Sequence, residues 1–282
     1  MKKNAKDSYI SSWKQLAKSW QLLTPPWHPG KKNLNDYKKI LREVTKNIKS
    51  PKVLILGATP EIRDLLAKYK NINVTLVDYN MEMILAMNEL IKNNNFMNER
   101  WLKSNWIDMP LEQGYYDVIF GDYITTQVPT ILIHKLLNKI KFLLSRKGRF
   151  VTRVCYYNKD EIKKFKEIID KFSKFKKNRR IITNLASELF KSIVIKKNNC
   201  YIFSLPLVKK LRDKYIRNKG NNELFLFLDK LFFPYKKQWF LFDLSDTEKI
   251  IKKHFIIVDK LREPVGSSLR QVTFIYNLKP KN

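Results

Sequence analysis

The chain contains few of the residues that build metal sites and disulfide frameworks. Its 282 residues include two cysteines and three histidines, which stand far apart as His28, His134, Cys155, Cys200 and His254. Structural zinc sites need cysteines and histidines in closely spaced groups, and small disulfide-bonded folds need more cysteines. The sequence therefore supports neither kind of site, and we predict no metal. Cys155 is interpreted as a small buried residue rather than a nucleophile.

A long apolar segment is also missing. No hydrophobic run approaches the roughly 18 residues that cross a bilayer, and Met1-Lys2-Lys3 is followed by polar residues rather than by the apolar core of a secretory signal. We therefore expect a cytoplasmic protein without membrane association. Because 44% of the residues are hydrophobic, the chain can bury a full core, and one α/β domain with appendages fits its length better than two independent domains.

Glycine is scarce, with seven in the whole chain, and the Gly-x-Gly-x-x-Gly turn of dinucleotide-binding proteins is absent. The segment Gly57-Ala58-Thr59-Pro60-Glu61 keeps only the first of those glycines. A pyrophosphate needs the second glycine for close approach to the backbone, so this segment counts against a dinucleotide dehydrogenase. Pro60 suits the first turn of a helix, and Thr59 can cap that helix.

The most informative feature that is present is a pair of strand-like runs joined by an amphipathic helix. Val53–Leu56 ends at Gly57, and Val74–Val77 ends at Asp78, about twenty residues further on. Parallel strands joined by a helix end at the same edge of a sheet, where a ligand crevice opens. A carboxylate at this edge can accept both hydroxyls of a ribose, so the spacing predicts an adenosine-containing cofactor. The alternative is that Gly57 only turns the chain and Asp78 caps the following helix.

The alternation of strands and helices continues beyond these two runs, as is typical of α/β folds. A further strand ends in Gly121-Asp122, again a small and an acidic residue at the predicted ligand edge. The periodicity predicts helix 60–70, strand 73–78, helix 81–93, strand 100–104, strand 116–121, helix 128–144 and strand 148–156.

Several of these segments resemble the motifs of class I S-adenosylmethionine-dependent methyltransferases. Leu54–Gly57 looks like the first motif of that family, Leu76–Asp78 like its acidic second motif, and Asp117–Asp122 like its fourth. Leu143–Val151 is similar to the passage before the fifth strand, and Ser104–Pro110 resembles the loop that contacts adenine. The Gly-Ala-Thr-Pro-Glu turn, together with a tryptophan-rich start, resembles one bacterial subgroup of the family.

This resemblance, which spans roughly residues 50–156, implies a fold and a cofactor. The implied fold is α/β, with a doubly wound, seven-stranded Rossmann-like sheet, and the implied cofactor is S-adenosylmethionine. The implied cofactor-binding residues are Gly57 and Ala58 at the methionine portion, Asp78 at the ribose with Tyr79 beside it, Asn105 and Trp106 at the adenine, and Asp122 at the amino-acid or acceptor edge. Asn105 stands where the family more often has aspartate, but an amide oxygen can still accept a hydrogen bond from the adenine amino group.

The remaining segments are expected to surround this half of the chain. We predict a helical leader at 1–50, the cofactor-binding core at 51–156, a helical cap insertion at 157–247 and C-terminal strands that complete the sheet at 248–282. In the resembled subgroup, a tryptophan-containing leader can fold over the cofactor pocket. Tyr9, Trp13, Trp20 and Trp27 are therefore candidate lid residues, and core packing is the alternative interpretation.

Within the leader, helices are predicted over 8–23 and 34–48. In the cap, a long helix is predicted over 159–175, followed by mainly helical chain to Leu231. Asp246-Thr247-Glu248 is a helix-start signal, and strands over 255–258 and 272–276 are expected to be the sixth strand and an antiparallel seventh strand.

Acidic residues are few, with 26 aspartates and glutamates against 56 lysines and arginines, which gives a net charge of +30. The excess avoids the cofactor half: residues 51–122 carry 7 basic and 10 acidic side chains, whereas 161–220 carry 18 and 5, and 1–50 carry 12 and 3. A basic leader and cap can bind RNA electrostatically. However, 44 of the 56 basic residues are lysine, and phosphate or guanine recognition normally uses arginine. A solvated surface is therefore the favoured interpretation.

Together these features predict a methyltransferase that moves a methyl group from S-adenosylmethionine to a small-molecule acceptor held between the leader and the cap. The alternatives are an RNA methyltransferase that uses the basic segments, and a noncatalytic protein that binds S-adenosylmethionine. No general base is assigned: Asp122, Tyr123 and His134 are candidates, and a structural role is the favoured interpretation of each. The acceptor and the oligomeric state stay open.

Overall fold

A computed structural model describes residue 20 and residues 23–93, 99–176, 178–220, 224–231 and 238–281, without the side chains of 227, 230 and 231. Most of the predicted helix over 8–23, including Tyr9 and Trp13, lies outside these residues. Among the residues described, no helix is both long and apolar enough to span a bilayer.

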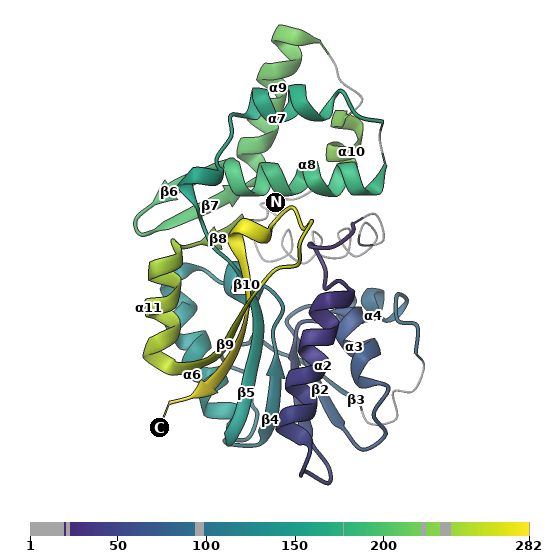
Figure 1. Cartoon of the computed structure of the whole chain (residues 1–282), viewed down its shortest axis with the longest axis vertical. Helices are drawn as coiled ribbons and strands as arrows, with labels where there is room; N and C mark the ends of the chain where they lie inside the picture. The colour runs from purple at the N-terminus through teal and green to yellow at the C-terminus, as the bar shows by residue number, and fades with distance from the viewer. Residues whose placement is uncertain are drawn as a thin grey trace, which may run out of the picture.

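A seven-stranded sheet forms the centre of the molecule, with helices on both faces (Figure 1). The strand order is β3-β2-β1-β4-β5-β10-β9, and β10 runs antiparallel to both of its neighbours while the other pairs are parallel. The strands are β1 (Lys52–Leu56), β2 (Asn73–Asp78), β3 (Glu99–Lys103), β4 (Tyr116–Phe120), β5 (Leu144–Cys155), β9 (Phe255–Arg262) and β10 (Thr273–Pro280). The predicted doubly wound α/β sheet with an antiparallel last strand is confirmed.

Both faces of this sheet are buried, which explains why its strands read as continuous apolar runs. Alternate residues of β1 point to opposite sides: Leu54 packs in the same apolar cluster as the buried residues of one helix layer, and Ile55 packs in that of the other. One layer consists of α6 (Ile133–Leu143) and α11 (Leu244–His254), and the other of α2 (Lys31–Thr45), α3 (Pro60–Leu66) and α4 (Met81–Asn88).

The cap lies beyond one end of the sheet (Figure 1). Its apolar core also includes buried residues from outside the cap: Leu23, Cys155, Leu269 and Val272. Its helices are α7 (Phe165–Phe172), α8 (Arg179–Ser192), α9 (Leu205–Lys219) and α10 (Leu224–Leu231). It also contains an antiparallel sheet in the order β6-β7-β8, formed by β6 (Val194–Lys197), β7 (Cys200–Ser204) and β8 (Gln238–Leu241). Helices make up most of the ordered elements of the cap, and the small β6-β7-β8 sheet was not predicted, because apolar runs this short do not distinguish a strand from a buried helix.

Several helix boundaries also differ from the prediction. The helix expected over 128–144 begins at Ile133, because Val128 precedes Pro129 and has an extended backbone, as residues before proline generally do. The chain between β4 and α6 contains the short helix α5 (Ile124–Gln127) and a 3₁₀ turn over Thr130–Leu132.

The long helix expected over 159–175 is interrupted as well. A 3₁₀ turn over Lys159–Glu161 ends at Ile162, whose backbone is extended, and α7 starts only at Phe165. The last helix, α11, follows Asp243 rather than the signal around Asp246.

Candidate functional site

Gly57 and Asp78 lie at the carboxyl ends of neighbouring parallel strands. The register pairs Leu56 of β1 with Val77 of β2, and the Gly57 N–H donates to the Val77 carbonyl at 2.8 Å. Gly57 has a φ of +102°, a backbone conformation that residues with a Cβ rarely adopt. The turn after β1 therefore requires this glycine.

The carboxylate of Asp78 is oriented by the loop that follows β2. Its Oδ1 accepts a hydrogen bond from the backbone N–H of Asn80 at 2.8 Å. Asn80 in turn caps α4, since its side chain accepts from the N–H of Glu82 at 3.0 Å. The cap of α4 is therefore Asn80, and Asp78 stands one turn before the helix at the edge of the sheet.

A cavity of about 370 Å³ opens at this edge, a volume within the range of about 300–1,000 Å³ that small-molecule sites occupy. The leader contributes Trp20, Leu23 and Trp27 to its lining, and the cap contributes Phe190 of α8 and Trp239 of β8. The cavity is also lined by all the residues predicted to bind the cofactor: Gly57, Ala58, Asp78, Tyr79, Asn105, Trp106 and Asp122.

Trp106 closes the cavity beside the β1 turn. Its indole Nε1–H donates to the Val77 carbonyl at 2.8 Å, and a Cβ built on Gly57 would lie 3.9 Å from the ring atom Cζ2. Asn105 shapes the same loop, because its Oδ1 accepts from the Ile107 N–H at 3.1 Å. The amide oxygen has a second lone pair, which can accept a hydrogen bond from an adenine amino group. The contact of Asn105 with adenine stays a prediction.

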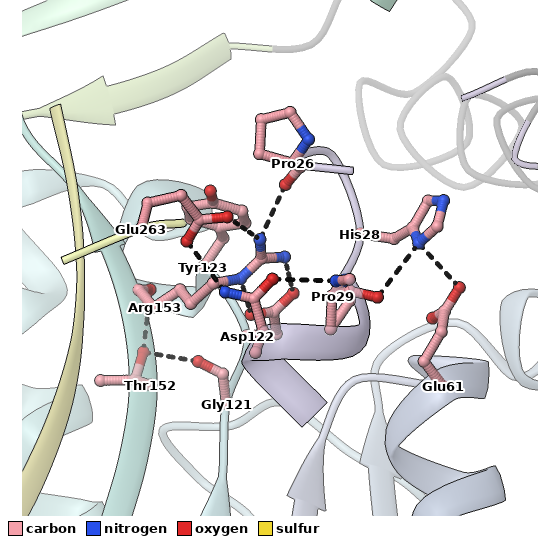
Figure 2. A network of polar contacts seen from close by, with 12 residues as sticks. Pro26, His28, Pro29, Glu61, Gly121, Asp122, Tyr123, Thr152, Arg153 and Glu263 are labelled. Carbon is pink, nitrogen blue, oxygen red and sulfur yellow. Dashed lines mark hydrogen bonds and ion pairs between the residues drawn. The ribbon is translucent and has the colours of Figure 1, made fainter. Parts of the chain in front are cut away.

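Asp122, just after β4, is held by Arg153 of β5 (Figure 2). The Arg153 Nε and Nη2 groups donate to the Asp122 Oδ1 and Oδ2 atoms, both at 2.7 Å, and the Tyr37 hydroxyl donates to Oδ1 at 2.9 Å. The Arg153 side chain is fully buried and that of Asp122 is 5% exposed. Both carboxylate oxygens at this end of the cavity are therefore engaged by the protein itself.

The same guanidinium group also binds the leader. Arg153 Nη1 donates to the Pro26 carbonyl at 2.9 Å and to Glu263 Oε1 at 3.3 Å (Figure 2). The Asn33 amide donates to Glu263 Oε2 at 3.1 Å. Burial raises the pKa of Glu263. Sequence reasoning missed Arg153 and Glu263, although an arginine inside the apolar strand predicted over 148–156 was a signal that a buried partner exists.

The leader turn, residues 24–30, bridges the core and the cap. On the cap side, the Trp27 indole donates to Ser187 Oγ at 3.1 Å, and the Thr24 hydroxyl lies 2.9 Å from Thr183 Oγ1. On the core side, His28 Nδ1 lies 3.1 Å from Glu61 Oε1 at the start of α3 (Figure 2). Burial is the largest single influence and opposes the charge of His28, but the hydrogen bond and negative charge of Glu61, together with the Leu23 and Pro29 carbonyls, outweigh burial and raise the pKa of His28. Glu61 is thus a partner of the leader.

The surroundings of the candidate bases Tyr123 and His134 fit structural roles. Burial raises the pKa of Tyr123 far above its ordinary value, and the Arg153 guanidinium carbon lies 4.3 Å from its ring centroid. His134 lies on α6, where its Nδ1 is 2.8 Å from His254 Nε2, and it is absent from the described cavity lining. Burial raises the pKa of Cys155 to about 12, which keeps its thiol protonated. Within the described part of the chain, no cluster of three His, Cys, Asp or Glu side chains could hold a metal ion.

The sequence matches a family model described as a methyltransferase domain over residues 59–205. No curated protein matches it.

Solved structures share the fold at low sequence identity. A protein from Rhodobacter sphaeroides described as a putative zinc-dependent alcohol dehydrogenase is 13% identical, with 97% of this chain and 99% of that chain covered and a TM-score of 0.61. The 1,6-didemethyltoxoflavin-N1-methyltransferase of Burkholderia thailandensis, with bound S-adenosylhomocysteine, is 12% identical over 98% and 87%, with a TM-score of 0.55. The N-methyltransferase NodS of Bradyrhizobium japonicum, in complex with the same molecule, is 10% identical over 98% and 100%, with a TM-score of 0.53.

Proposed function

The chain belongs to the methyltransferase-domain family, and from this we propose that it transfers a methyl group from S-adenosylmethionine to a small-molecule acceptor held between the leader and the cap. The observation that carries the proposal is the shared opening of Gly57 and Asp78 onto one cavity. A glycine turn with positive φ and a carboxylate at adjacent strand ends are the features that fit a ribose-containing cofactor.

The chain's own residues fit the cofactor in a definite order along the cavity. When bound, S-adenosylmethionine supplies a methyl group on a positively charged sulfur. Asp78 accepts the ribose hydroxyls, with Tyr79 beside it, while the Gly57-Ala58 turn leaves room for the methionine portion. Asn105 and Trp106 flank the adenine, and we assign Asp122 to the end of the cofactor site nearest the acceptor.

The protein contributes to the reaction chiefly by positioning the acceptor and excluding water. Bound S-adenosylmethionine would offer its methyl carbon to a lone pair of the acceptor heteroatom, with sulfur keeping the electron pair of the carbon–sulfur bond, and the proton of the acceptor would pass to bulk water when the product leaves. The described lining offers Asp78, Tyr79, Asp122 and Tyr123 as titratable groups. Because Asp122 is paired with Arg153 and the pKa of Tyr123 is raised, neither is assigned as a general base.

A small acceptor is favoured over RNA by the walls of the cavity. Despite the net charge of +30, none of the described lining residues is lysine or arginine. A nucleic-acid site would need such residues to neutralise phosphates. The basic residues of the leader and cap are then a solvated surface.

We further infer that the chain falls in the bacterial subgroup with a Gly-x-Thr-Pro-Glu first motif. The local geometry supports this: Pro60 occupies the first turn of α3, Thr59 precedes it, and Glu61 contacts His28 of the leader. In this arrangement the motif joins the cofactor turn to the leader.

The proposal is tested by incubating the protein with S-adenosylmethionine carrying a labelled methyl group and either the low-molecular-weight fraction of a bacterial extract or its RNA. We expect release of S-adenosylhomocysteine and label in the low-molecular-weight fraction. Label in RNA would contradict the acceptor class. Absence of S-adenosylhomocysteine from both arms would contradict turnover.

A further inference from the structure

The end of the cavity that the leader and the cap line is walled by aromatic rings. Trp27 and Phe190 pack edge to face, with ring centroids 5.6 Å apart and an interplanar angle of 69°. Phe190 and Trp239 do the same at 6.4 Å and 85°. The hydrogen bond from Trp27 to Ser187 fixes the leader ring against the cap. These three residues form a preordered apolar wall, which suits a flat ring.

Two polar atoms at this end have no hydrogen-bond partner among the described residues. They are the Tyr123 hydroxyl and Gln127 Oε1, and both are buried. Both residues line the cavity, Tyr123 at the start of the short helix α5 and Gln127 as its last residue. Buried polar groups are almost always paired, because leaving one unpaired costs free energy. A ligand with an acceptor for the hydroxyl and a donor for the amide oxygen would satisfy both.

The charges around this end favour a neutral ligand. No lysine or arginine lines the described part of the cavity, and the nearby Arg153 is already engaged by Asp122, Glu263 and the Pro26 carbonyl. An anionic ligand would therefore lose its hydration without gaining a cation. A cationic ligand would meet no uncommitted carboxylate in the described lining, because Asp122 is paired and Asp78 is assigned to the cofactor.

We propose that the Trp27, Phe190 and Trp239 wall, with Tyr123 and Gln127, is an acceptor subsite for a neutral, flat, ring-containing molecule that carries a hydrogen-bond donor and acceptor at its edge. The proposal deepens the proposed function and rests on it. The Tyr123 hydroxyl donates to the molecule, and Gln127 Oε1 accepts from it.

The test uses 4-quinolone, a neutral fused ring with one N–H and one carbonyl, titrated into the full chain without cofactor and followed by ligand-detected NMR. Its matched partner is 4-quinolone-2-carboxylate, which adds one negative charge. We expect 4-quinolone to bind at least tenfold more tightly than the carboxylate. Tyr123→Phe and Gln127→Leu should each weaken its binding about fivefold, the scale of one hydrogen bond.

The control variant is Tyr115→Phe, which removes a hydroxyl from an exposed tyrosine outside the cavity lining and should leave binding unchanged. Tyr123→Phe removes a hydroxyl without a described partner, and Gln127→Leu removes such an oxygen together with an Nε2 group that donates to the neighbouring Thr126 Oγ1 at 3.3 Å, so both should keep a melting temperature close to that of the parent. The proposal is overturned if 4-quinolone does not bind, if the carboxylate binds equally or better, or if neither cavity variant differs from the control. A parallel titration with S-adenosylhomocysteine separates the two proposals, since its failure counts against the methyl donor and leaves the 4-quinolone result unaffected.

Discussion

Arg153 carries its charge in the interior, where the guanidinium meets two carboxylates and a backbone carbonyl. A buried charge is tolerated only when it is paired and hydrogen-bonded, and Arg153 is both. Through Asp122 it reaches the end of β4, and through Pro26 it reaches the leader. One side chain therefore ties together two parts of the cavity wall.

Replacing Arg153 with methionine should lower the free energy of unfolding by about 3–5 kcal/mol, because the carboxylates of Asp122 and Glu263 stay buried without their cation. Urea denaturation measures this loss. The matched control is Arg63→Met, since Arg63 pairs with Glu99 in an equally buried ion pair, with side chains 0% and 5% exposed.

Both variants should lose stability, but only Arg153→Met should loosen the leader, because only Arg153 binds the Pro26 carbonyl. Trypsin cleavage after the exposed Lys31 and Lys32, identified by mass spectrometry, reports this difference. Equal cleavage of the two variants would contradict the role of Arg153 in holding the leader. Full stability of Arg153→Met would contradict its role in neutralising the buried carboxylates.

Helices α6 and α11 are joined by a pair of histidines. His254 Nε2 lies 2.8 Å from His134 Nδ1, and His254 Nδ1 lies 2.8 Å from Asn138 Oδ1. Burial lowers the pKa of His254, and the nearby His134 and Lys141 lower it further. The two hydrogen bonds fit a neutral His254 that donates through Nδ1 and accepts through Nε2.

The lowered pKa of His254 makes stability depend on pH in a defined direction. In the unfolded chain His254 takes up a proton near pH 6.5, whereas in the folded chain it does so only at a lower pH. The stabilisation is therefore present above pH 6.5 and is lost as the pH falls. We expect the unfolding free energy of His254→Gln to decrease less between pH 7 and pH 5 than that of the parent, because glutamine takes up no proton in this range. Denaturation at both pH values tests this. Identical pH dependence in variant and parent would rule the pair out as the cause.

For helices and strands, the sequence was a good guide to the central sheet and a poorer guide to the cap. Runs such as Val53–Leu56 are bounded by glycine or acidic residues and alternate with amphipathic helices, so both their type and their order could be predicted. The strands of the small cap sheet are four or five residues long, and β8 joins β7 across a long stretch of chain. Pairing of that kind leaves no local periodicity.

The whole molecule combines a strongly basic composition with a cavity that has no described lysine or arginine in its lining. Surface charges are screened by salt, whereas contacts to a neutral or zwitterionic ligand in an apolar cavity change little. We expect the affinity for S-adenosylhomocysteine to vary by less than about twofold between 50 and 500 mM salt. Any affinity of the basic surface for RNA should fall by about 1,000-fold or more over this range. Calorimetry and fluorescence anisotropy measure the two, and a parallel fall would place cofactor binding on the basic surface.

The candidate site could be predicted in part for a physical reason. Gly57 and Asp78 are fixed by local turn geometry and strand spacing, which a sequence displays directly. Arg153 and Glu263 lie 110 positions apart, and Trp27 meets Ser187 across 160 positions. Such pairs form only when the leader and the cap fold against the core. A single residue in the sequence does not indicate which distant residue it will contact.

The most direct test of the account is a calorimetric titration of S-adenosylhomocysteine into the parent, Asp78→Ala and Asp160→Ala. Asp160 is exposed and outside the cavity lining, so its replacement makes the same change in charge without touching the site. Loss of the Asp78 carboxylate should weaken binding by about 1–3 kcal/mol, roughly 5- to 150-fold, with Asp160→Ala unchanged. Equal affinity in Asp78→Ala and the parent would contradict the assignment of this carboxylate to the ribose.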